Sequence, residues 1–149
     1  MHDTRGDYDT AVTLHREALA IQLQVHGAQA RNTEIANSHE NCGNALYHRA
    51  VCSTRAHDTD ACADLACAQG HLATSVAMRH VGSTSGQGYP YARSLCKLAD
   101  VLQVRNDLRG ARCAYLEALR VLYTMPLSKF TAHKRARIAK ALQRLHTAG

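Results

Sequence analysis

Four side chains in the middle of the chain are of types that bind metals or carry out redox chemistry. Cys52, His57, Cys62 and Cys67 follow one another at intervals of five residues. Zinc sites instead show cysteines two to four residues apart, because four ligands must converge tetrahedrally. On a helix, five residues turn the chain by about 500°, so successive ligands would point about 140° apart. We therefore interpret these cysteines as small apolar packing residues. A zinc-binding module built on this stretch is the alternative.

The remaining residues that could do chemistry are scattered along the chain. Ten histidines occur, yet the sequence contains no H-E-x-x-H motif, nucleophile elbow or dinucleotide fingerprint. The glycines of the segment 83–90 lack the lysine of a phosphate-binding loop, so this segment is interpreted as a surface connection. We expect no catalytic residues, no metal and no cofactor. The chain is predicted not to be an enzyme.

Length and composition are typical of one globular domain. The 149 residues are 46% hydrophobic and 20% charged, and no apolar run approaches the roughly 20 residues of a membrane span. The N-terminus does not resemble a secretion signal, so the six cysteines are predicted to be thiols in the cytoplasm.

The net charge of +6 comes from one end of the chain. Residues 129–149 contain six Lys and Arg and no Asp or Glu, while residues 1–128 are balanced, with twelve of each sign. This distribution favours a helical protein with a cationic terminal segment over a DNA-binding face. A basic C-terminal helix that binds nucleic acid or another acidic surface is the alternative.

The sequence contains internal repeats. Residues 6–21 recur one hundred positions later, with Asp, Ala, Glu, Ala and Leu coinciding without a gap. A fainter copy aligns Ala73 with Ala18 at an offset of 55. A second kind of segment, 36–47, aligns with 92–103 at an offset of 56, and 138–145 is a further version. Such repeats predict helical units that bury their apolar stripes by stacking.

The clearest pair of predicted helices lies around residue 106. Leu95, Leu98, Ala99 and Leu102 have the spacing i, i+3, i+4, i+7, which makes one apolar stripe on a helix. A matching stripe follows at Ala111, Ala114, Tyr115, Ala118, Leu119 and Leu122. With only Arg105, Asn106 and Asp107 between them, the two helices are expected to form an antiparallel hairpin.

These residues resemble tetratricopeptide repeats, in the longer-repeat style of kinesin light chains. The family pattern W-x2-L-G-x2-Y…A-x3-F appears as Leu95-x2-Leu98-Ala99-x2-Leu102, followed by Ala111-x3-Tyr115. Residues 8–47 also match, through Tyr8-x2-Ala11, Glu17-Ala18-Leu19-Ala20-Ile21 and Gly27. The resemblance implies an all-α fold of stacked antiparallel helix hairpins, an α-solenoid, in which residues 1–149 form a single array of about three repeats.

The chain also departs from the family pattern. The first helix of the opening repeat is missing, because Met1 lies about ten residues before Ala11, so the chain is interpreted as a fragment or as an array that begins mid-repeat. The middle repeat is degenerate at 48–72, with an insertion at 48–65. His39 and Cys42 stand where the family has large apolar residues. The segment 129–146 is predicted to be a capping helix or the first helix of a further repeat.

The resemblance implies a non-enzymatic protein-interaction or scaffold module that binds a peptide or protein partner in a concave groove. The first helix of each hairpin lines that groove. The predicted peptide-binding residues are Asn37, Asn41, Asn44, Tyr47, Arg93, Lys97 and Gln103, and Glu40, Cys96 and Asp100 are expected on the same faces. Asn41, Arg93 and Lys97 are similar to part of the carboxylate clamp by which some members of the family hold acidic C-terminal tails.

Overall fold

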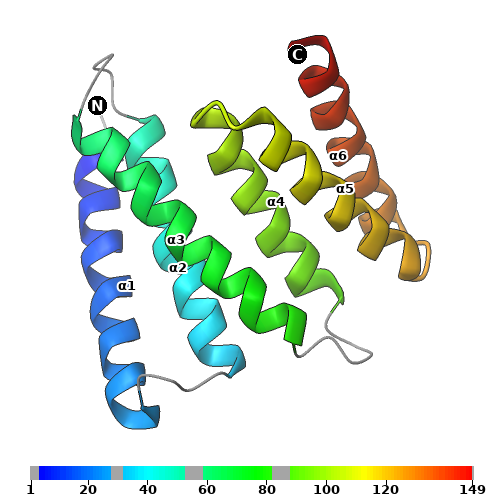
Figure 1. The fold of residues 1–149 in the computed structure, drawn as a ribbon. Helices are drawn as coiled ribbons and strands as arrows, with labels where there is room; N and C mark the ends of the chain where they lie inside the picture. The colour runs from blue at the N-terminus through cyan, green and yellow to red at the C-terminus, as the bar shows by residue number, and fades with distance from the viewer. Residues whose placement is uncertain (1–3, 28–31, 53–58, 82–87, 149) are drawn as a thin grey trace. The chain divides into compact units, whose positions relative to one another are not determined.

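The computed structural model describes residues 4–27, 32–52, 59–81 and 88–148. These ranges form six α-helices and no strand, which confirms the all-α class (Figure 1). The helices are α1 (Thr4–His26), α2 (Thr33–Val51), α3 (Thr59–Val81), α4 (Gly88–Val104), α5 (Leu108–Thr124) and α6 (Lys129–Ala148). Within the same ranges, none of the helices has both the length and the apolar character that crossing a membrane requires.

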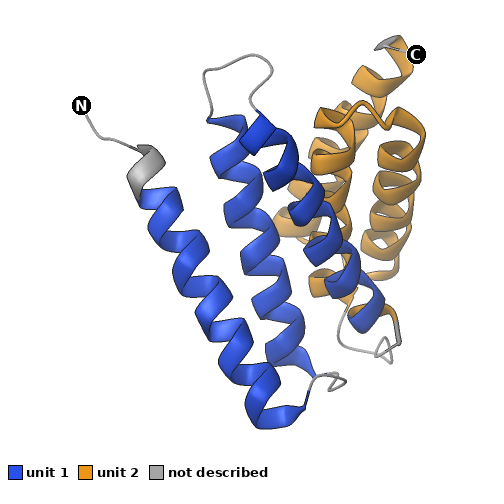
Figure 2. Cartoon of the chain, turned by 60° about the vertical axis from the view of Figure 1, so that its left-hand side comes forward, with its two compact units in different colours: residues 1–78 blue, residues 79–149 orange. Residues whose placement is uncertain are grey.

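The chain divides into two compact units, residues 1–78 and residues 79–149 (Figure 2). Unit 1 contains α1, α2 and most of α3, and unit 2 contains α4, α5 and α6. The stretch predicted as degenerate is helical at 48–51 and at 59–72, and residues 53–58 lie outside the described part of the chain. His57 is one of these undescribed residues.

In unit 1, α1 and α2 pack through apolar side chains. Leu19 of α1 lies in a core cluster with Ile35 and Cys42 of α2, and Leu23 and Met78 pack against this cluster. Cys42, which stands where the family has a large apolar residue, is fully buried as a free thiol and packs as a small apolar side chain. Burial raises the pKa of this thiol, which keeps it neutral.

A glycine lets α2 and α3 approach closely. A Cβ atom placed on Gly43 would lie 2.7 Å from Cγ of Leu72 and 3.1 Å from the carbonyl oxygen of Ala68. Three residues of α3 are fully buried along this face: Ala68, Leu72 and Ser75. Ser75 donates a hydrogen bond to the carbonyl oxygen of Ala36, 3.0 Å away. The residues of α3 that face α2 are therefore spaced i, i+4, i+7.

The fainter repeat copy pairs Ala73 with Ala18, and both of these alanines are exposed. Ala73 follows Leu72 by one residue and so points about 100° away from the face that meets α2. The buried small residue of this part of α3 is instead Ser75.

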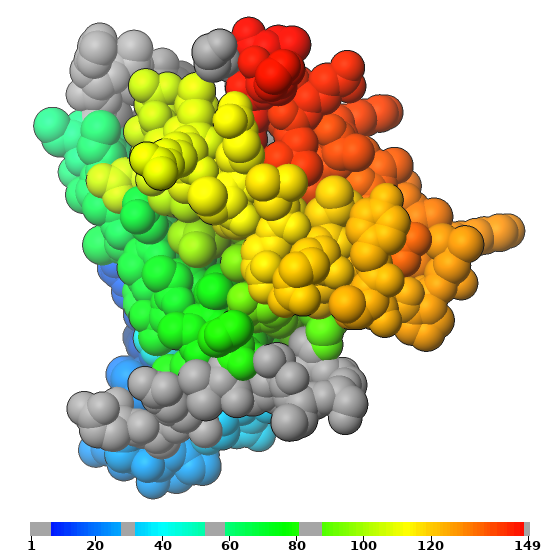
Figure 3. All heavy atoms as spheres, turned by 45° about the vertical axis from the view of Figure 1, so that its right-hand side comes forward, coloured from blue at the N-terminus to red at the C-terminus, as the bar shows by residue number. Residues whose placement is uncertain are grey.

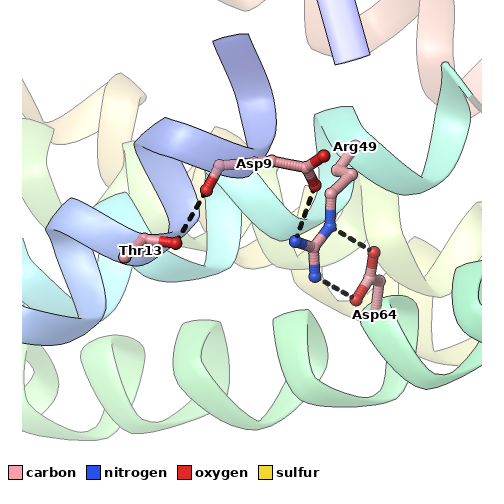
Figure 4. Close-up of polar contacts among 4 residues, drawn as sticks. All are labelled: Asp9, Thr13, Arg49 and Asp64. Atoms are coloured by element: carbon pink, nitrogen blue, oxygen red, sulfur yellow. Dashed lines mark hydrogen bonds and ion pairs between the residues drawn. The ribbon is translucent and has the colours of Figure 1, made fainter. Parts of the chain in front are cut away.

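A single guanidinium group joins all three helices of unit 1 (Figure 4). Nε and Nη2 of Arg49 in α2 each donate to a carboxylate oxygen of Asp64 in α3, over 2.7 Å. Nη1 of Arg49 donates to Asp9 of α1 over 3.1 Å, and Thr13 donates to the carbonyl oxygen of Asp9. The hydrogen bonds from Arg49 to Asp64 are the main cause of its raised pKa. Such a two-pronged Arg–carboxylate pair fixes geometry as well as charge.

In unit 2, α4 and α5 form the predicted hairpin. Asn106 adopts a left-handed backbone with φ of 66°, and the N–H of Asp107 bonds to the carbonyl of Leu102 over 2.8 Å. This pattern is a Schellman termination of α4. Asp107 then caps α5, because its carboxylate accepts from the N–H of Gly110 over 2.9 Å. Three residues therefore suffice to reverse the chain.

The α4–α5 crossing is built from small residues. Ala99, Ala111 and Ala118 are fully buried, and Tyr115 fills the space beside them, as expected from its position in the repeat pattern. The hydroxyl group of Tyr115 donates a hydrogen bond to the carboxylate of Asp100. The buried hydroxyl thereby has the partner that an interior tyrosine requires.

Helix α6 packs beside α5, and the space-filling view shows the two in contact (Figure 3). Ile138, Ala141 and Leu145 are buried in this contact, while Leu142 is half-buried. At the start of α6, Ser128 and Thr131 exchange two hydrogen bonds. The N–H of Thr131 donates to Oγ of Ser128, and the N–H of Ser128 donates to Oγ1 of Thr131. This reciprocal cap sets the point at which α6 begins.

The close approach at Gly43 predicts opposite effects for one substitution at two glycines. Gly43→Ala is expected to lower the free energy of unfolding by about 1 kcal/mol, because overpacking costs about 1–3 kcal/mol and alanine returns at most about 1 kcal/mol of helix propensity. Gly70→Ala, which meets no atom within 4 Å, is expected to raise it by about 0.5–1 kcal/mol. Urea unfolding followed by circular dichroism measures both. Stabilisation by Gly43→Ala would show that the two helices are not in close contact there.

Candidate functional site

The asparagines predicted to bind a peptide form a narrow stripe on α2. Asn37, Asn41 and Asn44 are spaced i, i+4, i+7; the first two are exposed and Asn44 is half-buried. The N-terminus of the helix is held by Asn32, whose side chain accepts from the N–H of Ile35 over 2.8 Å. Amide side chains in such a row offer both donors and acceptors to an extended backbone.

Two other residues predicted on this face of α2 lie differently. Glu40 is only 2% exposed and carries interactions of its own, so the expectation that it faces a ligand is wrong. A charged side chain is buried only where partners compensate the loss of water. Tyr47 is half-buried, and its ring packs edge-on against His48. The accessible part of the stripe therefore consists of the asparagines.

On α4, the predicted residues Arg93, Lys97 and Gln103 are all half-buried. The guanidinium of Arg93 lies over the ring of Tyr89, 5.7 Å from its centroid, which is a cation–π contact. Gln103 belongs to the last turn of α4, where its carbonyl accepts the N–H of Asn106. Asn41 belongs to unit 1, whereas Arg93 and Lys97 belong to unit 2, so the carboxylate clamp of these three residues stays a prediction.

Helix α6 adds charges next to those of α4. The rings of Tyr89 in α4 and Phe130 in α6 meet edge to face, with centroids 4.7 Å apart. Lys134 lies over the ring of Phe130 at 5.6 Å, and the charges of Lys134 and Arg137 both act on Cys96 of α4. We call Arg93, Lys97, Lys134 and Arg137 the cationic face of unit 2.

The sequence assigns Lys134 and Arg137 to a capping helix and gives them a binding role only in the alternative of a basic C-terminal helix. Their distance from Arg93 along the chain hides their proximity to α4 in space. The available signal was the absence of any acidic residue in 129–149, next to an α4 that carries one, Asp100. Asp100 accepts a hydrogen bond from Tyr115 of α5, and its carboxylate is the one negative charge on α4.

Cys96 lies beside this cationic face and is not a reactive thiol. Burial raises its pKa to about 11, and the carboxylate of Asp100 contributes in the same direction. Arg137 and Lys134 favour the thiolate, but their effect is smaller. With this raised pKa, Cys96 stays a neutral thiol at physiological pH. The thiolate, which is the form that acts as nucleophile or metal ligand, is therefore not populated.

One basic residue of α6 has a structural role instead. Nη2 of Arg135 donates to the carbonyl oxygens of Leu122 and Met125, at 3.0 and 3.4 Å, where α5 ends. Its guanidinium also covers the ring of Tyr123, 4.2 Å from the centroid. A cation at a helix C-terminus stabilises the unsatisfied carbonyl groups there. Arg135 therefore connects α6 to the end of α5.

Two histidines of unit 1 form a close pair. Nδ1 of His39 in α2 lies 3.0 Å from Nδ1 of His71 in α3. Burial lowers the pKa of both rings, and the charges of His39 and Arg16 lower that of His71 further. One ring must donate and the other accept, so the pair requires that at least one imidazole be neutral. The nearby positive charge of Arg16 makes the pair a poor cation site.

The cysteines of the central stretch do not converge on a common point. Cys52, just after α2, and Cys62 and Cys67 on α3 are all exposed, so the interpretation of these three cysteines as packing residues is wrong. Among the described residues, no group of three or more His, Cys, Asp or Glu is placed to hold a metal ion. All six cysteines are free thiols.

No protein-family model matches the chain, and no curated protein is significantly similar to it in sequence.

The histidine pair predicts a loss of stability in mild acid. Unfolded histidine has a pKa of about 6.5, and the folded values are lower, so the unfolded state binds more protons below neutrality. The contribution to stability is complete above pH about 6.5 and falls as pH drops from there towards the folded pKa values. We expect the double variant His39→Gln/His71→Gln to lose much of this pH dependence in urea unfolding between pH 7.5 and 5.5.

Exposed His146 provides the control for that measurement. His146→Gln removes an exposed imidazole of α6, in the other unit, and its unfolding is measured over the same pH range for comparison with the double variant. An equal loss of stability in acid for the double variant and the unaltered chain would contradict the role given to the pair.

Proposed function

We propose that this chain is a non-enzymatic protein-interaction module of tetratricopeptide-like hairpins that binds an acidic peptide segment on the cationic face of unit 2. The observation that carries this proposal is the convergence of charges from α4 and α6. Together the two helices contain eight Lys and Arg and one Asp. The aromatic contact of Tyr89 with Phe130 joins the two helices that carry this face.

The helix packing inside each unit supports the proposed relation to tetratricopeptide repeats. Gly43 and Ala99 are 56 residues apart, and each is a small residue buried in its own unit. The partner helices repeat one pattern of buried residues: Ala68-x3-Leu72-x2-Ser75 in α3, and Ala111-x3-Tyr115-x2-Ala118 in α5. This is the A-x3-F spacing of the family, with a further small residue one turn later. We also propose that residues 1–149 form a single array of these tetratricopeptide-like repeats.

The asparagine stripe on α2 is a second contact surface in the proposal. Asn37, Asn41 and Asn44 would form hydrogen bonds to the backbone of an extended partner. Tyr47 would add a polar contact on α2, and Gln103 would add one on α4. Free cysteines are usual where cellular thiols are kept reduced, which favours the cytoplasm as the location.

The test uses a fluorescent glutamate-rich peptide and its glutamine-substituted counterpart, with binding followed by anisotropy. The purified chain should bind the acidic peptide and not the neutral one. Lys134→Gln/Arg137→Gln is expected to weaken binding about three- to tenfold, because each exposed ion pair contributes about 0.2–1 kcal/mol. The matched control Arg109→Gln/Arg112→Gln removes two exposed charges from α5 and should change affinity less than twofold.

The same assay separates a peptide partner from nucleic acid. A single-stranded oligonucleotide should bind weakly and lose affinity steeply with salt, since phosphate contacts release counterions. Tight oligonucleotide binding at physiological salt, without binding of the acidic peptide, would replace this proposal with the nucleic-acid alternative. Equal effects of the two double variants would show that only net charge matters.

A further inference from the structure

Helix α1 exposes an apolar stripe on the side away from α2. Leu14, Ile21 and Val25 are 58%, 60% and 72% exposed. Exposed Ala18 lies between Leu14 and Ile21 on the same side, and half-buried Ala11 lies one turn before Leu14. Val12 and Leu19, which are buried, lie on a different side of α1. The exposed stripe is thus separate from the contact that α1 makes inside unit 1.

The internal repeat shows what kind of surface this is. One hundred residues later, α5 carries Ala111, Ala114, Ala118 and Val121 at the positions of Ala11, Leu14, Ala18 and Ile21. All four residues of α5 are buried, and α5 packs closely against α4. The stripe on α1 is therefore the counterpart of a surface of α5 that packs against α4 in unit 2.

The spacing of the stripe also fits helix pairing. Asp7, Ala11, Leu14, Ala18, Ile21 and Val25 follow one another at alternating intervals of four and three residues. This is the heptad spacing by which two helices pack side by side. The positions that flank the stripe, at 10, 17 and 24 and at 8, 15 and 22, include one acidic residue, Glu17, and no Lys or Arg. A nearly neutral border selects an apolar helix over a charged ligand.

We propose that two copies of this chain pair through the stripe, α1 against α1, in an antiparallel dimer. The stripe supplies both halves of the contact, and a self-complementary patch closes into a two-fold dimer. The direction follows from Asp7, because a parallel pair would place the two Asp7 carboxylates opposite each other. In the antiparallel pair Leu14 lies opposite Val25 of the second copy, and Ala18 lies opposite Ile21.

The contact is small, so the dimer is reversible. One helix face buries much less than the roughly 1,600 Å² of a standard interface. Sedimentation velocity of the purified chain over a hundredfold range of concentration should show monomer passing into dimer. Sedimentation as a monomer at every concentration would overturn the proposal, and so would species larger than a dimer.

Single variants test which surface forms the dimer. Leu14→Glu and Val25→Lys should each abolish the concentration dependence, because each places a charge opposite an apolar side chain. Leu116→Glu, at a residue 51% exposed on α5, is the matched control and should dimerise as the unaltered chain does. All substituted side chains are exposed, and circular dichroism should report unchanged helicity. Dimerisation that persists in Leu14→Glu would place the contact elsewhere.

Mixing the two disrupted variants tests direction and self-association together. In an antiparallel heterodimer, the new carboxylate at position 14 meets the new ammonium at position 25, and the other end keeps its Leu14–Val25 contact. An equimolar mixture of Leu14→Glu and Val25→Lys should therefore recover dimer that neither variant forms alone. Failure of the mixture to dimerise would overturn the antiparallel pairing. None of these measurements uses the cationic face, so their outcome is independent of peptide binding.

Discussion

Close approach of helix backbones at small residues is the constraint on which both units depend. Gly43 brings α2 against Leu72 of α3, and Ala99 brings α4 against α5. The sequence has no tryptophan, one phenylalanine and six tyrosines, so few large side chains are available to fill wide gaps between helices. Packing at interior density then requires that the helices themselves come close, since voids forfeit dispersion contacts. At these contacts the side chains are those of alanine, glycine and serine, which are small enough to let the helix backbones come close.

Small side chains hold two helices close but do little to fix their mutual register, and polar contacts take that role. Arg49 holds α1 and α3 by their carboxylates, and Tyr115 bonds to Asp100 across the α4–α5 crossing. Arg135 likewise connects α6 to the carbonyl groups at the end of α5. The bonds of Tyr115 and Arg135 connect α5 to α4 and to α6, the two helices on which the residues of the cationic face lie. The cationic face and the contacts between helices therefore use the same few residue types, and position decides which role each residue has.

Local signals in the sequence predicted the α4–α5 hairpin well, because Asn106 and Asp107 end one helix and cap the next within three residues. The buried face of α3 was harder to predict, because small residues occur on both of its faces: Ser75 is fully buried and Ala73 is exposed. Burial of Glu40 and the gathering of Lys134 and Arg137 beside α4 depend on contacts between distant segments. Periodicity along one helix carries no information about such contacts. The binding role proposed for the cationic face rests on its charge.

The distribution of the thiols has a consequence for chemical ageing of the protein. Cys42 and Cys96, which lie against neighbouring helices, are kept protonated by burial. Cys52, Cys62, Cys67 and Cys113 are exposed. Oxidants and alkylating agents attack accessible thiolates first. Damage of this kind would accumulate on the outer surfaces of the helices, and the packed interior would keep its sulfur atoms intact until the chain unfolds.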